Sequence, residues 1–155
     1  MKVYRLARKK YADQLSGKGT SLSGNRWNSK GVEIIYTADS RALAMAEVLV
    51  HLPLNLLPDD YKMICIEIPN SIYISTLNPP NFASFFGNSL NYSRSQSVGD
   101  EFIKLNKYCV LKVPSAVVYG DFNYLINPFH KDFKKITIES TQDFPIDERF
   151  IKSEV

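Results

Sequence analysis

The fold is decided by SGNRWNSKGVEIIYTADSRALAMAEVLVHL, residues 23–52 of the chain. A glycine-containing loop carries Arg26 and Trp27, a short apolar run ends in Tyr36, and an apolar segment follows with a single acid, Glu47. A guanidinium, two aromatic rings and a carboxylate therefore lie within one short stretch. Side chains of these types bind and transform polar ligands, so the stretch supplies the first candidates for a functional site.

Residues 40–52 are predicted to form a helix. Ser40 suits the N-cap position, because its hydroxyl can accept a hydrogen bond from a free amide of the first turn. Residues 42–50 contain many strong helix formers, and Glu47 lies on the same stripe as Leu43. The segment is apolar nearly all round, so we expect a buried helix.

The role of Glu47 has two interpretations at this stage. A carboxylate within a buried helix must be paired, hydrogen-bonded or protonated. One interpretation is a structural ion pair, most simply with Arg26, that holds the preceding loop. The other is a catalytic carboxylate at the wall of a polar pocket, because perturbed carboxylates cluster at functional sites.

The composition is that of an ordinary soluble globular protein. A length of 155 residues predicts one domain, residues 1–155, and 45% hydrophobic with 23% charged residues excludes a disordered chain as the default. The net charge of +3 falls short of the clustered basic surface of a dedicated nucleic-acid binder. Direct binding to nucleic acid is therefore not expected, and a non-catalytic basic binding module is a distant alternative.

The cysteines and histidines do not indicate a metal site. Cys65 and Cys109 each lie in an apolar run, where a thiol behaves as a small hydrophobe. His51 and His130 have no carboxylate at ligand spacing, so we expect no metal. Residues 1–10 lack the apolar region of a signal peptide, and no apolar run approaches the roughly 20 residues that span a bilayer. We expect a cytoplasmic protein without a membrane segment.

Alternating and β-branched runs predict short strands along the whole chain. The expected strands are residues 2–7, 32–36, 61–68, 72–75, 108–113, 116–119, 123–127 and 136–140. One strong helix early in the chain and the absence of βαβα alternation predict an α+β fold. Its sheet should be twisted and partly antiparallel, with few helices.

The remaining segments are predicted to be loops, with one exception. Residues 18–25 are rich in Gly, Ser and Thr, which favours a surface loop that delivers Arg26. Residues 77–99 are also expected to be a loop, and a loop this long in a compact domain usually has a function. Residues 100–107 are predicted to form a short helix, and the tail from about residue 141 has no clear pattern.

Taken singly, the short motifs do not decide the function. Gly17 and Gly19 are not placed between a strand and a helix as a phosphate-binding loop requires. Ser115 lacks the G-x-S-x-G pattern of a hydrolase nucleophile. Pro114 and Ser115, between two expected strands, are compatible with either a β-bulge or a functional role.

Taken together, the motifs resemble those of the RES-domain family of bacterial toxins, which is named for an arginine, a glutamate and a serine. The motifs are GNRWN at 24–28, YTA at 36–38, Glu47, GD at 99–100, VPSA at 113–116 and NYLINPFH at 123–130. The similarity extends from the first strand to about residue 138. The chain departs from the family at Asn25, where a second glycine is frequent, and at Phe102, where tryptophan is common.

This resemblance implies a toxin of a type II toxin–antitoxin pair with a fold similar to that of ADP-ribosyltransferases. Such a toxin would deplete cellular NAD by cleaving the nicotinamide–ribose bond, as a glycohydrolase or phosphorylase, and arrest growth. NAD would be the substrate, with no other cofactor. The resemblance assigns catalysis to Arg26, Glu47 and Ser115, and NAD binding to Arg26, Tyr36, Ser115 and Asn127.

The chemistry of these residue types suits the implied reaction. A guanidinium can bind a pyrophosphate, an aromatic ring can stack on nicotinamide, and a carboxylate can stabilise oxocarbenium-like charge. The implied partners are a cognate antitoxin with a helix-turn-helix DNA-binding domain and a second copy of the chain within the complex. Transfer of ADP-ribose to a protein remains an alternative, because acceptor choice depends on surface loops such as residues 77–99.

Overall fold

The computed structural model describes residues 1–52, 58–78 and 92–150, which form one seven-stranded sheet and the helices around it. The strands are β1 (Lys2–Arg8), β2 (Ile35–Ala38), β3 (Tyr61–Glu67), β4 (Ile74–Thr76), β5 (Val110–Pro114), β6 (Phe122–Ile126) and β7 (Thr137–Asp143). The α-helices are α1 (Lys18–Ser23), α2 (Arg41–Leu49) and α4 (Ser93–Leu105), and the 3-10 turns are η1 (Lys9–Tyr11), η2 (Phe133–Lys135) and η3 (Glu148–Phe150).

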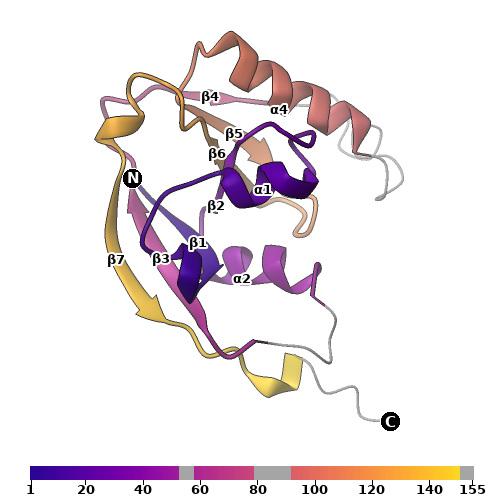
Figure 1. The fold of residues 1–155 in the computed structure, drawn as a ribbon, viewed down its shortest axis with the longest axis vertical. Coiled ribbons are helices and arrows are strands. Elements are labelled where there is room, and N and C mark those ends of the chain that lie inside the picture. The colour runs from indigo at the N-terminus through magenta and orange to yellow at the C-terminus, as the bar shows by residue number, and fades with distance from the viewer. Residues whose placement is uncertain (53–57, 79–91, 151–155) are drawn as a thin grey trace.

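The sheet has the order β4-β5-β6-β2-β1-β3-β7. Neighbouring strands are antiparallel except for β4 and β5, which are parallel. In Figure 1, α1 and α4 lie in the upper half of the view with β4, β5 and β6, and α2 lies in the lower half with β1 and β3. The prediction of an α+β fold with a partly antiparallel sheet is confirmed.

The two faces of the sheet are covered differently. Because side chains alternate along a strand, Val3, Ile35 and Ile126 contribute to one continuous core on one face. The other face carries two separate clusters. One contains Trp27, Ile34, Phe102, Leu111, Val113 and Leu125, and the other contains Leu6, Ala38, Leu43, Ala44, Tyr61 and Met63. The division into two clusters leaves room for a cavity between them.

The central strands β1 and β2 meet at a single residue pair, Tyr4 with Ala38. By contrast, β1 pairs with β3 along its whole length, from Lys2 with Glu67 to Arg8 with Tyr61. Beyond Tyr4, therefore, β1 and β2 diverge, and the residues next to the pair on each strand are not joined by a ladder. This divergence opens the middle of the sheet.

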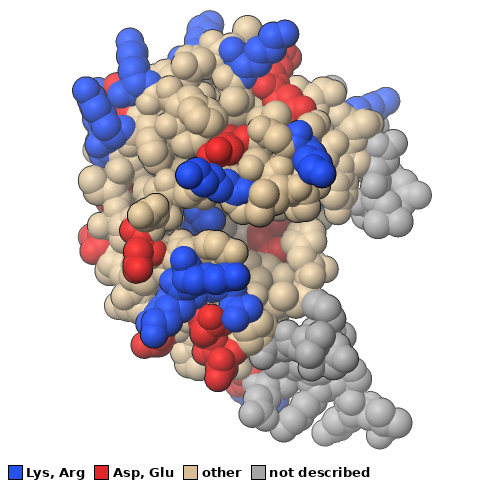
Figure 2. Space-filling model, viewed as in Figure 1, with Lys and Arg blue, Asp and Glu red and all other residues tan. Residues whose placement is uncertain are grey.

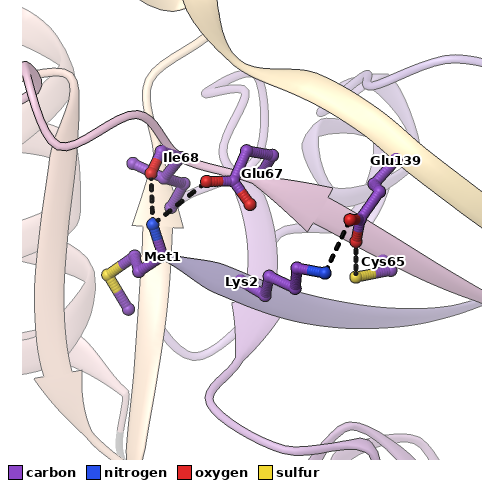
Figure 3. Close-up of polar contacts among 6 residues, drawn as sticks. All are labelled: Met1, Lys2, Cys65, Glu67, Ile68 and Glu139. Carbon is purple, nitrogen blue, oxygen red and sulfur yellow. Dashed lines mark hydrogen bonds and ion pairs between the residues drawn. The ribbon is translucent and has the colours of Figure 1, made fainter.

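Polar contacts join β1, β3 and β7 near the start of the chain (Figure 3). Glu139 on β7 forms an ion pair with Lys2 at 2.6 Å and accepts a hydrogen bond from the Cys65 thiol at 3.0 Å. The N-terminal ammonium donates to the carbonyl oxygen of Ile68 at 2.6 Å. Burial, and then the hydrogen bond to Glu139, raise the pKa of the Cys65 thiol, so it remains a protonated donor. Cys65 is therefore a buried structural residue, as its sequence context predicted.

The predicted helix over residues 40–52 is confirmed as α2, with one correction. The Ser40 hydroxyl accepts a hydrogen bond from the Leu43 amide at 3.0 Å, which is the expected N-cap. Helix α2 ends at Leu49, however, and only Leu43 and Ala44 are buried in it. The expectation of a helix buried all round is wrong, because α2 packs on β1 and β2 with one side only and Val50 is 58% exposed.

The predicted loop over residues 18–25 is wrong, because residues 18–23 form α1. Hydroxyl groups stabilise this short helix by bonding to backbone carbonyls. Thr20 Oγ1 donates to the carbonyls of Gly17 and Ile34, each at 2.8 Å. Gly24 ends the helix with φ of 75°, a conformation that side chains disfavour. Helix α1 has no buried residues, so it lacks the apolar face by which a helix is usually recognised in a sequence, and these hydrogen bonds stabilise it instead.

The expectations for residues 77–99 and 100–107 are also wrong in part. Residues 93–105 form one helix, α4, whose polar first half binds to the loop that carries Arg26. Such contacts join residues far apart in sequence and leave no local pattern. The aromatic part of the predicted loop, within residues 79–91, lies outside the described residues.

Two further corrections concern strands. Residues 116–119 form a bend and turn, because the Ser115 hydroxyl accepts hydrogen bonds from the amides of Val117 and Val118 and holds the chain in a tight turn. The strand predicted at 32–36 lies at 35–38 instead, because the Val32 amide donates to the carbonyl of Ser29 in a turn, and residues 32–34 belong to no strand. The other predicted strands overlap observed ones, although β7 extends into the tail as far as Asp143.

Candidate active site

A cavity of about 640 Å³ lies where β1 and β2 diverge, between the two clusters on that face of the sheet. Figure 2 shows the molecule indented between α1 and α2, with basic and acidic side chains at the indentation. The lining residues are Arg5, Leu6, Thr20, Asn25, Arg26, Trp27, Tyr36, Thr37, Ala38, Ala44, Glu47, Val48, Val50, His51, Leu52, Tyr92, Ala116, Val117 and Asn123. Both sides of the β1–β2 opening contribute to the wall, through Arg5 and Leu6 and through Tyr36 and Thr37.

The loop that presents Arg26 is closed on itself and fastened to α4. The amide of Asn25 donates to the carbonyl of Asn28 at 2.9 Å, which forms a tight turn around Arg26. Ser95 Oγ donates to the carbonyl of Arg26 at 2.5 Å, and Gln96 Nε2 donates to the carbonyl of Asn25 at 2.9 Å. Helix α4 therefore fixes the backbone from which the Arg26 side chain projects.

Gly99 allows α4 to contact this loop directly. A Cβ atom at Gly99 would lie 1.7 Å from the carbonyl oxygen of Trp27, far closer than any real contact. One residue further on, Asp100 Oδ1 accepts a hydrogen bond from the Ser29 amide at 2.9 Å. In the sequence, residues 99–100 stand out only as a motif. In the structure they allow α4 to pack directly against the loop that carries Arg26.

We predict that Gly99→Ala destabilises the protein, because the new methyl group would push α4 away from Trp27. Overpacking of this kind costs at least about 1–3 kcal/mol of unfolding free energy. Gly19→Ala is the matched control, because nothing lies within 4 Å of a Cβ at Gly19. Urea unfolding of the two variants measures the effect, and equal stability of the two would show that the contact at Gly99 has been misjudged.

Tyr36 has a structural contact in addition to its place in the cavity wall. Its hydroxyl accepts a hydrogen bond from the Trp27 amide at 2.9 Å and donates to Asn28 Oδ1 at 2.7 Å. Burial strongly raises the pKa of Tyr36, so the phenol is protonated at all physiological pH values. The Tyr36 hydroxyl thus anchors the Arg26 loop, while the Tyr36 ring lines the cavity.

We predict that Tyr36→Phe loosens this loop although it keeps the ring. The substitution removes the Tyr36 hydroxyl that accepts from the Trp27 amide and donates to Asn28 Oδ1, and each buried group left unsatisfied costs about 1–3 kcal/mol. Hydrogen exchange at the Trp27 amide should become faster than in the unaltered protein. Unchanged protection of that amide would refute the anchoring function of the hydroxyl.

Arg26 lies above the ring of Tyr92, with its guanidinium carbon 4.3 Å from the ring centroid. This cation–π contact stabilises one orientation of the charge at the cavity wall. Arg26 and Glu47 both line the cavity, but they are not within ion-pair distance of each other. The interpretation of Glu47 as half of an ion pair with Arg26 is therefore wrong.

Arg5 is a cavity residue that the sequence analysis did not place in the site. Arg5 lies between Val3 and Ala7 on β1, on the face of the strand whose other residues are buried in the core. Its guanidinium donates to the carbonyl of Ser16 at 3.1 Å. Burial lowers the pKa of Arg5, although arginine stays protonated in proteins. Among the described residues no acid lies within ion-pair distance of it. A charged residue on the apolar face of a strand was the signal available in the sequence.

The Glu47 carboxylate is held by two donors from other elements. Its Oε1 atom accepts from Ser115 Oγ at 2.8 Å and from Asn123 Nδ2 at 2.5 Å. Ser115 is fully buried, and its oxygen also accepts from the amides of Val117 and Val118, both at 3.0 Å. With these bonds the Ser115 hydroxyl uses its donor and both lone pairs, so Ser115 is a buried residue that orients Glu47.

Asn127, the remaining candidate, is not brought to the cavity. It is fully buried at the opposite end of β6 from Asn123, where its Nδ2 donates to Asn106 Oδ1 and its Oδ1 accepts from the Phe129 amide, both at 2.9 Å. The structure thus brings Arg26, Tyr36 and Glu47 together and places Asn127 in a structural turn. Asn123, from the same NYLIN run, lines the cavity instead.

Across residues 1–52, 58–78 and 92–150, no group of three or more His, Cys, Asp and Glu side chains is arranged to hold a metal ion. Over the same ranges, no helix has the length and apolar character needed to cross a membrane.

A solved structure has the same fold. In the crystal structure of the M. tuberculosis MbcT–MbcA toxin–antitoxin complex, one chain matches 93% of this chain and 84% of its own length, with a TM-score of 0.73 and 21% identity. The fold and the site together define an α+β domain with a charged ligand cavity in a divided sheet.

The family is shown by sequence comparison. The family model for the RES domain matches residues 2–147, and the chain belongs to the RES-domain toxin family. Its relatives include the Prs ADP-ribosylating toxin of Sphingobium sp. (strain YBL2), 36% identical over 148 residues, which are 94% of this chain and 92% of that protein. The toxin Res of Photorhabdus laumondii is 36% identical over 155 residues, 99% of each chain. The family resemblance noted in the sequence is confirmed.

Proposed function

We propose that this protein is the toxin of a toxin–antitoxin pair and that it consumes NAD by breaking the bond between nicotinamide and ribose. The observation that supports this most is Glu47, a carboxylate held on one oxygen by two donors in a cavity that also contains two guanidinium groups. A dinucleotide with two phosphates and a cationic glycosidic carbon in the transition state complements this distribution of charge.

The cavity residues divide the substrate between them. Arg5 and Arg26 bind the pyrophosphate, because planar guanidinium groups match phosphate oxygens. The Tyr36 ring lies against the nicotinamide end, and Glu47 faces the ribose carbon C1′. A volume of about 640 Å³ is within the range of small-molecule sites. No further cofactor takes part in this proposal, because NAD itself is the substrate.

The bond changes balance without a further reactant beyond the acceptor. The bond between C1′ and the pyridinium nitrogen breaks, its electron pair goes to that nitrogen, and neutral nicotinamide leaves. The Glu47 carboxylate stabilises the oxocarbenium-like charge that develops at C1′. An oxygen of water or of phosphate then bonds to C1′, and the acceptor releases one proton.

A second candidate is transfer of ADP-ribose to a protein. It is favoured by the 36% identity to a relative named as a Prs ADP-ribosylating toxin. Mass spectrometry of the products from NAD, with and without phosphate and cell lysate, distinguishes the acceptors. Free ADP-ribose indicates hydrolysis, ADP-ribose 1″-phosphate indicates phosphorolysis, and labelled protein indicates transfer.

The proposal extends to partners and place of action. The cognate partner is an antitoxin with a helix-turn-helix DNA-binding domain and a segment that blocks the cavity, and the toxin is a homodimer in that complex. NAD is in the cytoplasm, so the toxin acts there. We predict that expression of the toxin alone lowers cellular NAD and arrests growth, and that the antitoxin relieves both effects. Cells that arrest with constant NAD would contradict the proposal.

We predict that Arg26→Lys weakens NAD binding while the fold persists. Lysine keeps the positive charge but loses the planar fork and most of the contact with the Tyr92 ring. Calorimetric titration with NAD measures the loss, and Arg5→Lys tests the second guanidinium in the same way. Full affinity in Arg26→Lys would assign the pyrophosphate to Arg5 alone.

We predict that Glu47→Gln reduces NAD turnover by a hundredfold or more with little change in stability. The amide oxygen of Gln still accepts from Ser115 and Asn123, whereas the negative charge is lost. Loss of one charge-stabilising group costs on the order of 2.7–4 kcal/mol in the activation free energy. Glu101→Gln, on the exposed side of α4, is the control. A Glu47→Gln protein that turns over NAD at the unaltered rate would refute the catalytic assignment.

A further inference from the structure

Asn123 is the second residue of β6 and is buried, with 6% of its surface exposed. Its side chain lies on the same face of the strand as Leu125, the face that the cavity occupies. From there Nδ2 donates to Oε1 of Glu47, which lies on α2, at 2.5 Å. Asn123 is the first residue of the NYLINPFH motif, but the resemblance assigned it no role.

The orientation of the Asn123 amide is fixed by the carboxylate. The opposite end of the amide, Oδ1, is buried and has no hydrogen-bond partner in the described part of the chain. Rotation of the amide by 180° would place Oδ1 against Glu47 Oε1, and two acceptors would then face each other. In the observed orientation Oδ1 is left unsatisfied while Nδ2 donates to Glu47 Oε1.

The two donors act on the same oxygen of Glu47. Ser115 and Asn123 both bind Oε1, and within the described residues Oε2 accepts no hydrogen bond. Two anchors from different elements fix the rotation of the carboxylate, which leaves Oε2 as the oxygen available to a ligand. With Ser115 alone, the group could rotate about a single contact.

We propose that Asn123 is a positioning residue that fixes the orientation of the Glu47 carboxylate and holds Oε2 toward the substrate. The consequence for turnover rests on the function proposed above, whereas the consequence for the orientation of the carboxylate does not. The other charged or titratable groups that face the cavity with Glu47 are Arg5 on β1, Arg26 in its loop, Tyr36 on β2, His51 after α2 and Tyr92 before α4. None of them is hydrogen-bonded to the Glu47 carboxylate.

The test compares three substitutions on β6. Asn123→Leu keeps the approximate shape and removes the donor, and Asn123→Asp keeps the shape and places a second carboxylate beside Glu47. Tyr124→Phe is the control, because Tyr124 is the next residue of β6 and faces the opposite core. Crystal structures of the substrate-free proteins show the orientation of the Glu47 carboxylate in each variant, and thermal unfolding shows that each variant is folded.

We expect the Glu47 carboxylate of Asn123→Leu to rotate about its remaining contact with Ser115, because one of its two donors is lost. In Asn123→Asp the second carboxylate should repel Glu47 Oε1 and displace it. Tyr124→Phe should keep the orientation of the unaltered protein. For NAD turnover, kcat of Asn123→Leu should fall about tenfold or more with little change in KM.

The outcomes separate the two proposals. An unchanged orientation of the Glu47 carboxylate in Asn123→Leu, together with an unchanged kcat, would overturn the positioning function. If Asn123→Leu does not fold, the nearly isosteric Asn123→Asp is used instead, and an undisplaced carboxylate in that variant would likewise overturn it. A rotated carboxylate in a protein that does not consume NAD would support the positioning function and refute the proposed activity.

Discussion

The site depends on the divergence of β1 and β2, which are joined by one residue pair in the centre of the sheet. The sheet remains intact because β1 is fully paired with β3, and β2 is paired with β6 at four positions. Each half has its own apolar cluster on the cavity side, while a single core on the other face connects them. The backbone is therefore held firmly on both sides of an opening, which is the arrangement a rigid ligand site requires.

The second requirement is that the acid and the arginines of the cavity do not neutralise one another. Glu47 is satisfied by the neutral donors Ser115 and Asn123, and Arg5 has no acid within ion-pair distance among the described residues. Burial of charge without a counter-charge is unfavourable for stability, and such groups are concentrated at functional sites. The arginines of the cavity can therefore bind an anionic ligand. The separate Glu47 carboxylate can stabilise positive charge that develops during a reaction.

The sequence predicts the parts of this structure that have a local cause. Alternation identifies β1, β3, β5 and β6, and the Ser40 cap with the apolar segment after it identifies α2. Helix α1, the first half of α4 and the turn after Ser115 are missed, because side-chain hydrogen bonds to backbone groups stabilise them. Propensity and periodicity do not register contacts of this kind.

The same distinction applies to the site. Arg26, Tyr36 and Glu47 are found from the sequence because they lie in one continuous stretch, whereas Arg5 and Asn123 reach the cavity only through the pairing of distant strands. Asn127 belongs to a recognisable motif, yet the alternation and length of β6 place it in a turn away from the cavity.

The most direct test of the central claim is a crystal structure of the Glu47→Gln protein with NAD. The account predicts the pyrophosphate between Arg5 and Arg26, the nicotinamide ring beside Tyr36, and C1′ of the adjoining ribose facing the substituted side chain at the place of the Glu47 carboxylate. NAD bound elsewhere on the protein, or bound in the cavity with its adenosine at residue 47, would contradict it.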